Sequence, residues 1–150
     1  MKNMEVIISC LDQSNLDECS HLYVKTFKQA PWNENWSMGD AFERLSDFLA
    51  SPNTVALKAI QNGCILGFLI GEIQRWNGAR FYYLKEICVG GETQRKGIGK
   101  SLIKNLESAL QKEEVTRIYL ITQRDSIPAN FYGSLEFNEN KNIMVMGKAV

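Results

Sequence analysis

Apolar residues recur at helical spacing in four stretches of the chain. In the first, Leu16, Cys19, Tyr23 and Phe27 lie three or four positions apart and form one apolar stripe. The second stretch follows Ser37, which reads as an N-cap, and the last carries Pro128 in its first turn. The spacing predicts helices over residues 12–28, from Ser37 past Leu49, over 97–110 and over 128–135.

Runs of β-branched and aromatic residues between turn signals predict strands. Asn62-Gly63 is hairpin chemistry between two such runs, and Asn77-Gly78 marks a second turn. The stretch 81–89 is apolar at nearly every position, which indicates a central strand. The predicted strands cover residues 4–9, 54–60, 64–74, 81–89, 117–122 and 141–148. Strands and helices in this order predict an α+β fold with a partly antiparallel sheet.

Composition narrows the classes of partner. Hydrophobic residues make up 45% and charged residues 23% of the 150 positions, which is ordinary for one globular domain spanning residues 1–150. The 17 basic and 17 acidic side chains cancel, so no net field attracts nucleic acid or an anionic membrane. No stretch has the length of a membrane span, and the N-terminal residues are too polar for a signal peptide. We expect a cytoplasmic protein without nucleic acid or membrane partners.

The four cysteines do not suggest a metal site. They are Cys10, Cys19, Cys64 and Cys88, and no two of them form a CxxC unit. Cys10, Cys64 and Cys88 lie in apolar, strand-like surroundings and read as small core residues. We expect no metal and a reducing compartment.

The loop between residues 89 and 98 has the chemistry of a phosphate cradle. A helix that begins near Gly97 offers free N–H groups and the positive end of its dipole. Glycines at 97 and 99 let an anion approach the backbone, and Arg95, Lys96 and Lys100 add charge around the same point. The loop fits neither GxxxxGK[ST] nor GxGxxG. The sequence therefore predicts a pyrophosphate site of another type.

With these residues the chain resembles the GNAT superfamily of acetyl-CoA-dependent N-acetyltransferases. The signature [QR]-x-x-G-x-[GA] is present as Gln94-Arg95-Lys96-Gly97-Ile98-Gly99, between a predicted strand and a predicted helix. The order of elements is also similar to that family over nearly the whole chain. The resemblance implies a mixed, mostly antiparallel sheet of about six or seven strands flanked by about four helices. It also implies acetyl-CoA as co-substrate.

A second motif lies downstream. The stretch 129–137 is similar to the family's A-x-x-[FL]-Y-x-x-x-G-F segment, and Tyr132 falls on the tyrosine that protonates the departing CoA thiol. The sequence departs from the pattern at Glu136, where the family usually has glycine, which puts the geometry of that turn in question. The resemblance assigns cofactor contacts to Ile87, Cys88, Val89, Gln94, Arg95, Lys96, Gly97, Ile98, Gly99 and Lys100, with Asn130 as a substitute for the family's asparagine near Ser126.

The base that deprotonates the acceptor amine is left open by the sequence. Many relatives place Glu or His at the position of Tyr83, and tyrosine is a poor base, with an ordinary pKa of about 10. Glu86 is one residue out of register, but a strand bulge would turn it towards the substrate. Glu72, Glu34 and ordered water are the alternatives. We take Tyr132 and Glu86 as the catalytic pair.

The loop 31–36 falls where family members shape the acceptor pocket. Trp32, Glu34 and Trp36, with Tyr83, would suit a cationic amine through ring faces and charge, whereas the tryptophans could equally be core. We expect direct acetyl transfer from acetyl-CoA to a primary amine of a small molecule in a ternary complex. The alternatives are acetylation of protein N-termini or lysines and a non-catalytic CoA-binding sensor. Pairing of the closing strand, Ile143 to Met146, across an edge would make a homodimer.

Overall fold

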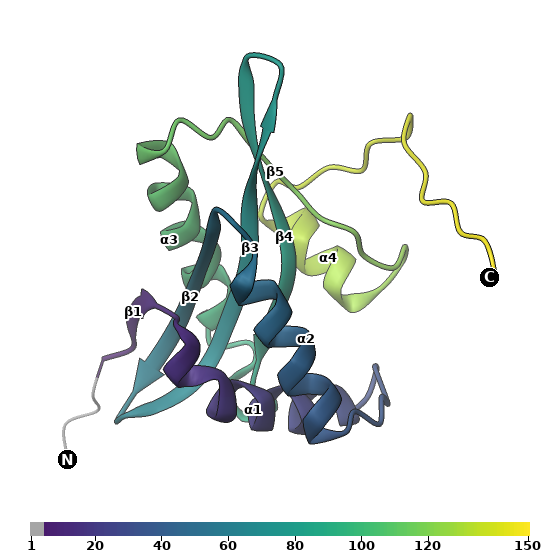
Figure 1. Ribbon diagram of the computed structural model, residues 1–150. Helices are drawn as coiled ribbons and strands as arrows, with labels where there is room; N and C mark the ends of the chain where they lie inside the picture. Colours follow the sequence, from purple (N-terminus) through teal and green to yellow (C-terminus); the bar gives the residue numbers. More distant parts are fainter. Residues whose placement is uncertain (1–4) are drawn as a thin grey trace.

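Five strands form one sheet in the computed structural model, which describes residues 5–150 (Figure 1). The strands are β1 (Ile7–Cys10), β2 (Thr54–Gln61), β3 (Cys64–Trp76), β4 (Ala79–Val89) and β5 (Arg117–Tyr119). They lie in the order β1-β2-β3-β4-β5; the first four pair antiparallel with their neighbours, and β5 runs parallel to β4. The predicted α+β class is confirmed. Met4, where the first strand was expected to begin, lies outside the described residues.

Four helices cover the sheet. They are α1 (Leu16–Lys28), α2 (Met38–Ala50), α3 (Ile98–Lys112) and α4 (Ile127–Ser134), with short 3-10 turns η1 (Gln13–Asn15) and η2 (Gly91–Thr93). The predicted cap at Ser37 is present, because its side chain accepts a hydrogen bond from the N–H of Asp40 at 3.0 Å. Ser126 caps α4 in the same way, through the N–H of Ala129 at 3.1 Å, with Pro128 in the first turn.

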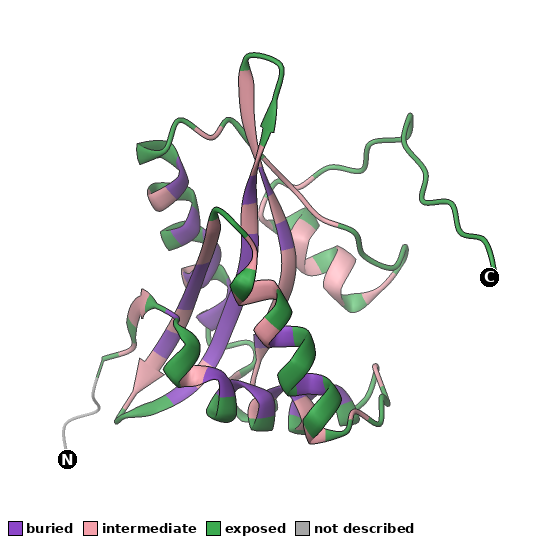
Figure 2. Cartoon of the chain, viewed as in Figure 1, coloured by how far each residue is buried: buried purple, intermediate pink, exposed green. Residues whose placement is uncertain are grey.

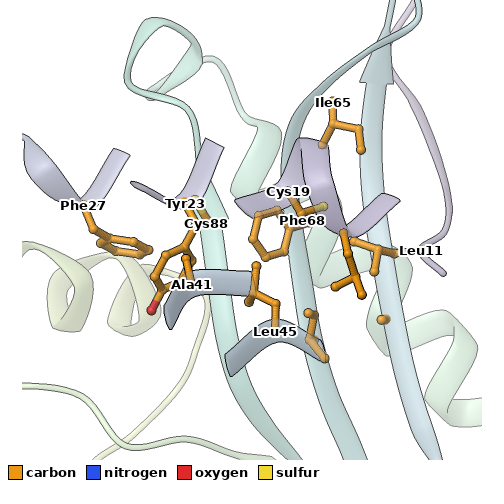
Figure 3. Close-up of a cluster of buried hydrophobic side chains, with 12 residues drawn as sticks. Leu11, Cys19, Tyr23, Phe27, Ala41, Leu45, Ile65, Phe68 and Cys88 are labelled. Atoms are coloured by element: carbon orange, nitrogen blue, oxygen red, sulfur yellow. The ribbon is translucent and has the colours of Figure 1, made fainter. Parts of the chain in front are cut away.

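Two cores lie on opposite faces of the sheet, as the buried positions in Figure 2 indicate. One lies under α1 and α2, where Tyr23, Leu45, Phe68 and Cys88 pack together (Figure 3). The other lies under α3, where Leu102, Ile103 and Leu106 are fully buried against β3 and β4. Because both faces of β4 are covered over most of its length, its sequence is apolar almost throughout.

A β-bulge interrupts β4. Ile70 of β3 pairs with Glu86, and the next residue, Gly71, pairs with Leu84, so Lys85 is an extra residue in β4. Glycine is required at position 71, because a Cβ there would overlap the Tyr82 ring, whose hydroxyl reaches the carbonyl of Val55 at 2.7 Å. The bulge therefore lets the side chains of consecutive residues, Lys85 and Glu86, contact groups on the α1–α2 side of the sheet.

Two predicted strands differ from the structure, and the strand count within residues 5–150 is five where about six or seven were expected. The strand over 117–122 ends at Tyr119, because the chain leaves β4 where the bulge begins. The prediction of a closing strand over 141–148 was wrong: this segment joins no strand, and Ile143 to Met146 are exposed. Apolar residues supply strand propensity but not a partner, and the three-residue β5 offers only a short edge.

Candidate active site

The sheet opens between β4 and β5. Parallel pairing joins only Phe81–Tyr83 to Arg117–Tyr119. Beyond Tyr83 no strand pairs with that edge of β4 within residues 5–150, which leaves a gap in the sheet pairing beside Ile87 to Val89. Polar backbone groups at such an edge are available to an extended ligand, which would add to β4 as another strand does. The three residues assigned to the cofactor by resemblance thus lie at an open edge.

The side chain of Cys88 lies in the core and not at the open edge of β4. Its side chain is 1% exposed and lies in the core under α1. Burial raises the pKa of the Cys88 thiol, so the thiolate that an acyl carrier needs is disfavoured. Only the backbone of Cys88 is therefore available to a ligand at the unpaired edge of β4.

The loop after β4 is built to leave backbone N–H groups free. Gln94 donates its side-chain N–H to the carbonyl of Val89 at 3.0 Å, which ties the loop to the end of β4. Gly97 adopts φ +82° and begins α3 without a side-chain cap. Within the described residues no acceptor faces the N–H groups of Ile98, Gly99 and Lys100, the first turn of α3. Gln94 therefore positions the loop, and the helix start provides the donors.

The charges around this helix start are accessible. Arg95, Lys96 and Lys100 are all exposed. Gly99 is buried, and a Cβ there would lie 2.9 Å from the Phe131 ring of α4, so this glycine allows α3 and α4 to approach. The arrangement combines the dipole of a 15-residue helix, free N–H donors and exposed cations, which is the chemistry of pyrophosphate binding.

Tyr132 lies on α4 and is held by aromatic neighbours. Its ring makes edge contacts with Phe131 and Phe137, at 5.3 and 5.6 Å between centroids. Burial first, and then the negative charge of Glu86, raise the pKa of Tyr132 above its ordinary value. The hydroxyl therefore stays protonated and can donate. The charge of Glu86 therefore acts on the Tyr132 hydroxyl, although the two side chains come from β4 and α4.

The turn after α4 explains the departure at Glu136. This residue adopts φ +71°, the left-handed conformation that glycine takes most easily, and the N–H of Phe137 bonds to the carbonyl of Tyr132 at 3.1 Å. The turn expected from glycine thus forms with glutamate in its place. Asn130 is exposed on α4.

Glu86 is the candidate base that the fold places best. Its carboxylate accepts hydrogen bonds from the Tyr23 hydroxyl at 3.0 Å and the Arg44 Nε at 3.4 Å. Burial raises the pKa of Glu86, while the charge of Arg44 and the Tyr23 hydrogen bond act against that rise, and the nearby charge of Glu34 adds to it. A carboxyl with a raised pKa is a stronger base when ionised.

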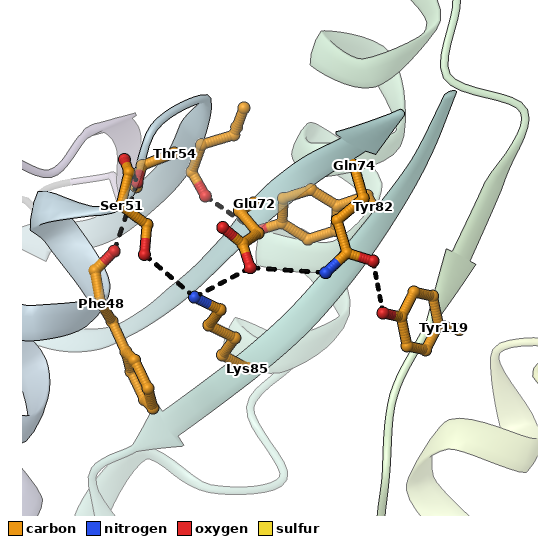
Figure 4. A network of polar contacts seen from close by, with 9 residues as sticks. Phe48, Ser51, Thr54, Glu72, Gln74, Tyr82, Lys85 and Tyr119 are labelled. Carbon is orange, nitrogen blue, oxygen red and sulfur yellow. Dashed lines mark hydrogen bonds and ion pairs between the residues drawn. The ribbon is translucent and has the colours of Figure 1, made fainter. Parts of the chain in front are cut away.

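The other candidate bases are engaged elsewhere. Lys85 lies between Glu72 and Ser51, with its Nζ 3.1 Å from the Glu72 Oε1, and Gln74 links Glu72 to Tyr119 (Figure 4). Tyr83 stacks on Tyr119, with ring centroids 4.8 Å apart and planes 3° from parallel. Glu72 therefore belongs to a polar network near the β4–β5 pairing, and Tyr83 stacks on Tyr119, which is part of that network.

The loop between α1 and α2 contributes both core and surface. Trp32 packs edge-on against Phe27, so it is largely satellite core. Trp36 packs against Tyr23 and donates its Nε1 proton to the exposed carboxylate of Glu34 at 3.1 Å. A shallow depression of about 170 Å³ lies here, lined by Glu34, Asn35, Trp36 and Asp40. Glu34 therefore acts electrostatically on Glu86, and Trp36 contacts Tyr23, which bonds to Glu86, whereas Trp32 packs against Phe27.

Sequence reasoning missed two residues of the site. Tyr23 reads as one position of the α1 core stripe, and its 3% exposure agrees with that. Arg44 follows Ala41 by three positions and precedes Phe48 by four, so it flanks the buried face of α2. Neither residue belongs to a motif. The one sequence feature that could have drawn attention to Arg44 is its position beside the apolar stripe of α2, and Tyr23 has none.

Neither a metal site nor a membrane span is found. Residues 5–150 contain no group of three or more His, Cys, Asp or Glu side chains that could hold a metal ion. In the same part of the chain, every helix is too short or too polar to cross a bilayer.

Comparisons with known proteins agree with this geometry. A curated relative, the [ribosomal protein bS18]-alanine N-acetyltransferase of Escherichia coli K12, is 27% identical over 133 residues, covering 88% of this chain and 80% of its own. A solved acetyltransferase candidate from Clostridium difficile 630 superposes with a TM-score of 0.81 at 17% identity, covering 97% and 98% of the two chains. An aminoglycoside N-acetyltransferase in complex with CoA gives 0.77 at 16% identity, covering 99% and 98%.

The solved structures share the fold, and the family model decides membership. The model of the acetyltransferase (GNAT) family matches residues 16–137, a range that includes α1, the bulged strand β4, the loop before α3 and Tyr132 on α4. Members of this family are acetyl-CoA-dependent N-acetyltransferases. The chain therefore belongs to the GNAT acetyltransferase family.

Proposed function

We propose that this enzyme transfers an acetyl group from acetyl-CoA to a primary amine of a small molecule, including cationic amines, by direct attack in a ternary complex. The observation that carries the proposal is the gap beside β4. Glu86 follows the bulge in β4, and its negative charge contributes to the raised pKa of the Tyr132 hydroxyl on α4. One group can accept a proton and the other can donate one, which is what amine acetylation requires.

The residues of the cofactor side fit acetyl-CoA. We define the cofactor side as the free edge Ile87–Val89, the loop 94–100 and Tyr132. The unpaired edge of β4 suits an extended arm with amide groups, and the free N–H groups of α3 suit a pyrophosphate. When bound, acetyl-CoA supplies a thioester carbonyl and a thiolate leaving group. Asn130, exposed on α4, is retained as a weaker contact of the same ligand.

Each residue of the proposed mechanism has one role in moving protons or stabilising charge. Glu86 accepts a proton from the acceptor nitrogen as the N–C bond forms. A backbone N–H near Cys88 or Val89 stabilises the oxyanion. Tyr132 donates its proton to the sulfur as the C–S bond breaks. Glu86 then releases its proton to solvent and Tyr132 takes one up from solvent, which restores both groups. Cys88, buried and with a raised thiol pKa, is bypassed, which supports transfer without an acetyl-enzyme.

The acceptor side supports a cationic amine. We define the acceptor side as Tyr23, Glu34, Trp36, Arg44 and Glu86. Glu34, Trp36 and Asp40 line a depression with two carboxylates and one ring. Carboxylates and ring faces attract ammonium groups. One neighbour of the same fold is an aminoglycoside acetyltransferase in complex with sisomicin, which agrees with a small cationic acceptor.

Acetylation of a protein N-terminus is the second candidate. The curated relative acetylates an alanine of ribosomal protein bS18, and it shares 27% of the aligned residues. The depression beside Trp36 is open, which suits a peptide as well as a small amine. Peptides and small amines therefore both belong in the acceptor test.

A homodimer is part of the proposal, in a cytoplasmic setting consistent with four free cysteines. Ile143, Met144, Val145 and Met146 are between 72% and 84% exposed, and four consecutive exposed apolar side chains favour association. Light scattering should give twice the mass of the 17.1 kDa chain, and deletion of residues 143–150 should halve it. A monomer for the full chain would remove the dimer and leave the chemistry untouched.

The proposed function is tested with a panel of amines and acetyl-CoA. The panel contains aminoglycosides, polyamines, amino-acid derivatives and peptides beginning with alanine, and released thiol is measured. We expect saturable thiol release with a small cationic amine. Release only with peptides would move the assignment to protein acetylation, and release with no amine would overturn the proposal.

A further inference from the structure

Two side chains from different helices donate hydrogen bonds to the Glu86 carboxylate. Tyr23 of α1 donates its hydroxyl to the Oε2 of Glu86 at 3.0 Å, and Arg44 of α2 donates its Nε to the same oxygen at 3.4 Å. Nothing in the resemblance assigns a role to either donor. The side chain of Glu86 is 14% exposed, so water can replace these donors only in part. The orientation of this carboxylate therefore depends on α1 and α2.

Tyr23 is held in place by packing. Its ring makes edge contacts with Phe27 at 4.6 Å and Trp36 at 5.1 Å, and the residue is 3% exposed. Burial raises the pKa of Tyr23, and so does the charge of Glu86, so the hydroxyl remains a donor. Because the Tyr23 ring is held by packing and its hydroxyl is protonated, its hydrogen bond restricts the position of the Glu86 Oε2.

Arg44 is held by two aromatic rings. Its guanidinium lies 4.7 Å from the ring centre of Phe48 and 5.6 Å from that of Trp36. These rings orient Arg44 although its side chain is 41% exposed. Lys85, the extra residue in β4, forms its ion pair with Glu72, so it does not compete for Glu86.

Charged or titratable groups from three helices, a loop and β4 interact electrostatically with Glu86. Tyr23 comes from α1, Glu34 from the following loop, Arg44 from α2, Tyr132 from α4 and Cys88 from β4 itself. Arg44 is the cation that interacts directly with the carboxylate, whereas Glu34 repels it. Tyr23 and Arg44 are thus the two groups that favour the ionised form of Glu86 against burial and Glu34.

We propose that Tyr23 and Arg44 are positioning residues that hold the Glu86 carboxylate in place to receive the proton of the acceptor amine. The inference rests on the proposed function, in which Glu86 is the base. Loss of either donor should leave Glu86 present but protonated over a wider pH range, because burial then acts with less opposition. The effect should therefore be strong at low pH and disappear at high pH.

The test is the pH profile of kcat/KM for Arg44→Gln, Arg44→Lys and Tyr23→Phe. The acid limb, absent in Glu86→Gln, should move up by about one pH unit in Arg44→Gln and by less in Tyr23→Phe. Arg44→Lys should lie between wild type and Arg44→Gln because a cation remains. The matched control is Arg80→Gln, which removes a guanidinium paired with Glu113 at 3.7 Å away from the site and should leave the limb unmoved.

A carboxyl ¹³C NMR titration, with the Glu86 signal assigned by its loss in Glu86→Gln, gives a second reading without substrates. The pKa of Glu86 should rise in Arg44→Gln and Tyr23→Phe. An unmoved Glu86 pKa, or a loss of kcat/KM by the same factor at every pH, would overturn the positioning role. An acid limb that persists in Glu86→Gln, or an enzyme inactive with all amines, counts against the proposed function, and the titration still decides the roles of Tyr23 and Arg44.

Discussion

The cofactor side and the acceptor side meet at β4, but they are made differently. The cofactor side uses backbone: a free strand edge, and N–H groups made available by Gly97 at φ +82°. The acceptor side uses side chains from α1, α2 and the bulge, joined by hydrogen bonds and ring contacts. A site that binds through backbone groups requires few particular residues, so most of its side chains can change without loss of binding. A site that binds through side chains changes with each substitution, which allows acceptors to differ between proteins with the same fold.

The largest effect should come from the acceptor side. Glu86→Gln removes the proton acceptor and should lower kcat/KM by about 10²- to 10⁴-fold, since this is the usual worth of general base catalysis. Calorimetry should show unchanged affinity for acetyl-CoA, because the free edge and the loop 94–100 are intact. Glu72→Gln is the comparison variant: it loses the partner of Lys85 and keeps the Tyr23 and Arg44 contacts of Glu86. A larger loss in Glu72→Gln than in Glu86→Gln would identify Glu72 as the base.

On the cofactor side, Tyr132→Phe should lower kcat by about 10²-fold while the Kd of acetyl-CoA stays the same. The ring contacts with Phe131 and Phe137 remain, so the change removes only the donor. Tyr119→Phe, which loses its bond to Gln74 in the polar network, is the control and should retain turnover. Equal turnover of Tyr132→Phe and wild type would exclude Tyr132 as the acid.

A smaller effect on binding is expected at Gly97. Gly97→Ala places a Cβ on a residue with φ +82° and costs about 1–2 kcal/mol if the conformation is kept. Relief of that strain would turn the N–H groups away, so the Kd of acetyl-CoA should rise roughly tenfold. Gly78→Ala is the matched control, because Gly78 has φ +73° and, like Gly97, open space around it, at the β3–β4 turn. If both variants lose affinity equally, the loss reflects stability and the cradle is not located here.

The smallest effect is expected at the rim of the acceptor side. Glu34→Gln removes an exposed charge and should raise the KM of a cationic acceptor about two- to fivefold, more at low salt, with little change in kcat. Asp17→Asn, in the first turn of α1 and exposed, is the control for loss of one negative charge. A KM that is insensitive to both would show that the depression does not bind the amine.

The difference between the two sides also decides what the sequence could predict. The cofactor loop could be proposed from sequence because Gln94, Gly97 and Gly99 form a local motif whose backbone geometry follows from glycine. The role of Gln94, which ties the loop to Val89, needed the structure. The acceptor side depends on a bulge and on α1 and α2 folding over it, so Tyr23 and Arg44 reach Glu86 from 63 and 42 positions away. No local pattern encodes such contacts.

Strand endings show the same limit. Apolar runs predicted the interior strands well, because both faces of β3 and β4 are covered by helices. At 117–122 and 141–148 the same residue types were assigned to strands, yet pairing stops at Tyr119 and the second segment has no strand neighbour. Pairing is decided by what lies beside a strand, and the end of the β4–β5 pairing at Tyr83 leaves the edge to which we assign the cofactor.

The central claim is that acetyl-CoA on the cofactor side and the amine on the acceptor side are bound at the same time. Initial-velocity kinetics test this claim most directly. Acetyl-CoA and the best amine of the panel are varied against each other, with thiol release as the signal. Lines that intersect in double-reciprocal plots are predicted, because Glu86, on the acceptor side, and Tyr132, on the cofactor side, must serve one direct transfer. Parallel lines, together with an acetyl group retained on the protein in the absence of amine, would contradict the account.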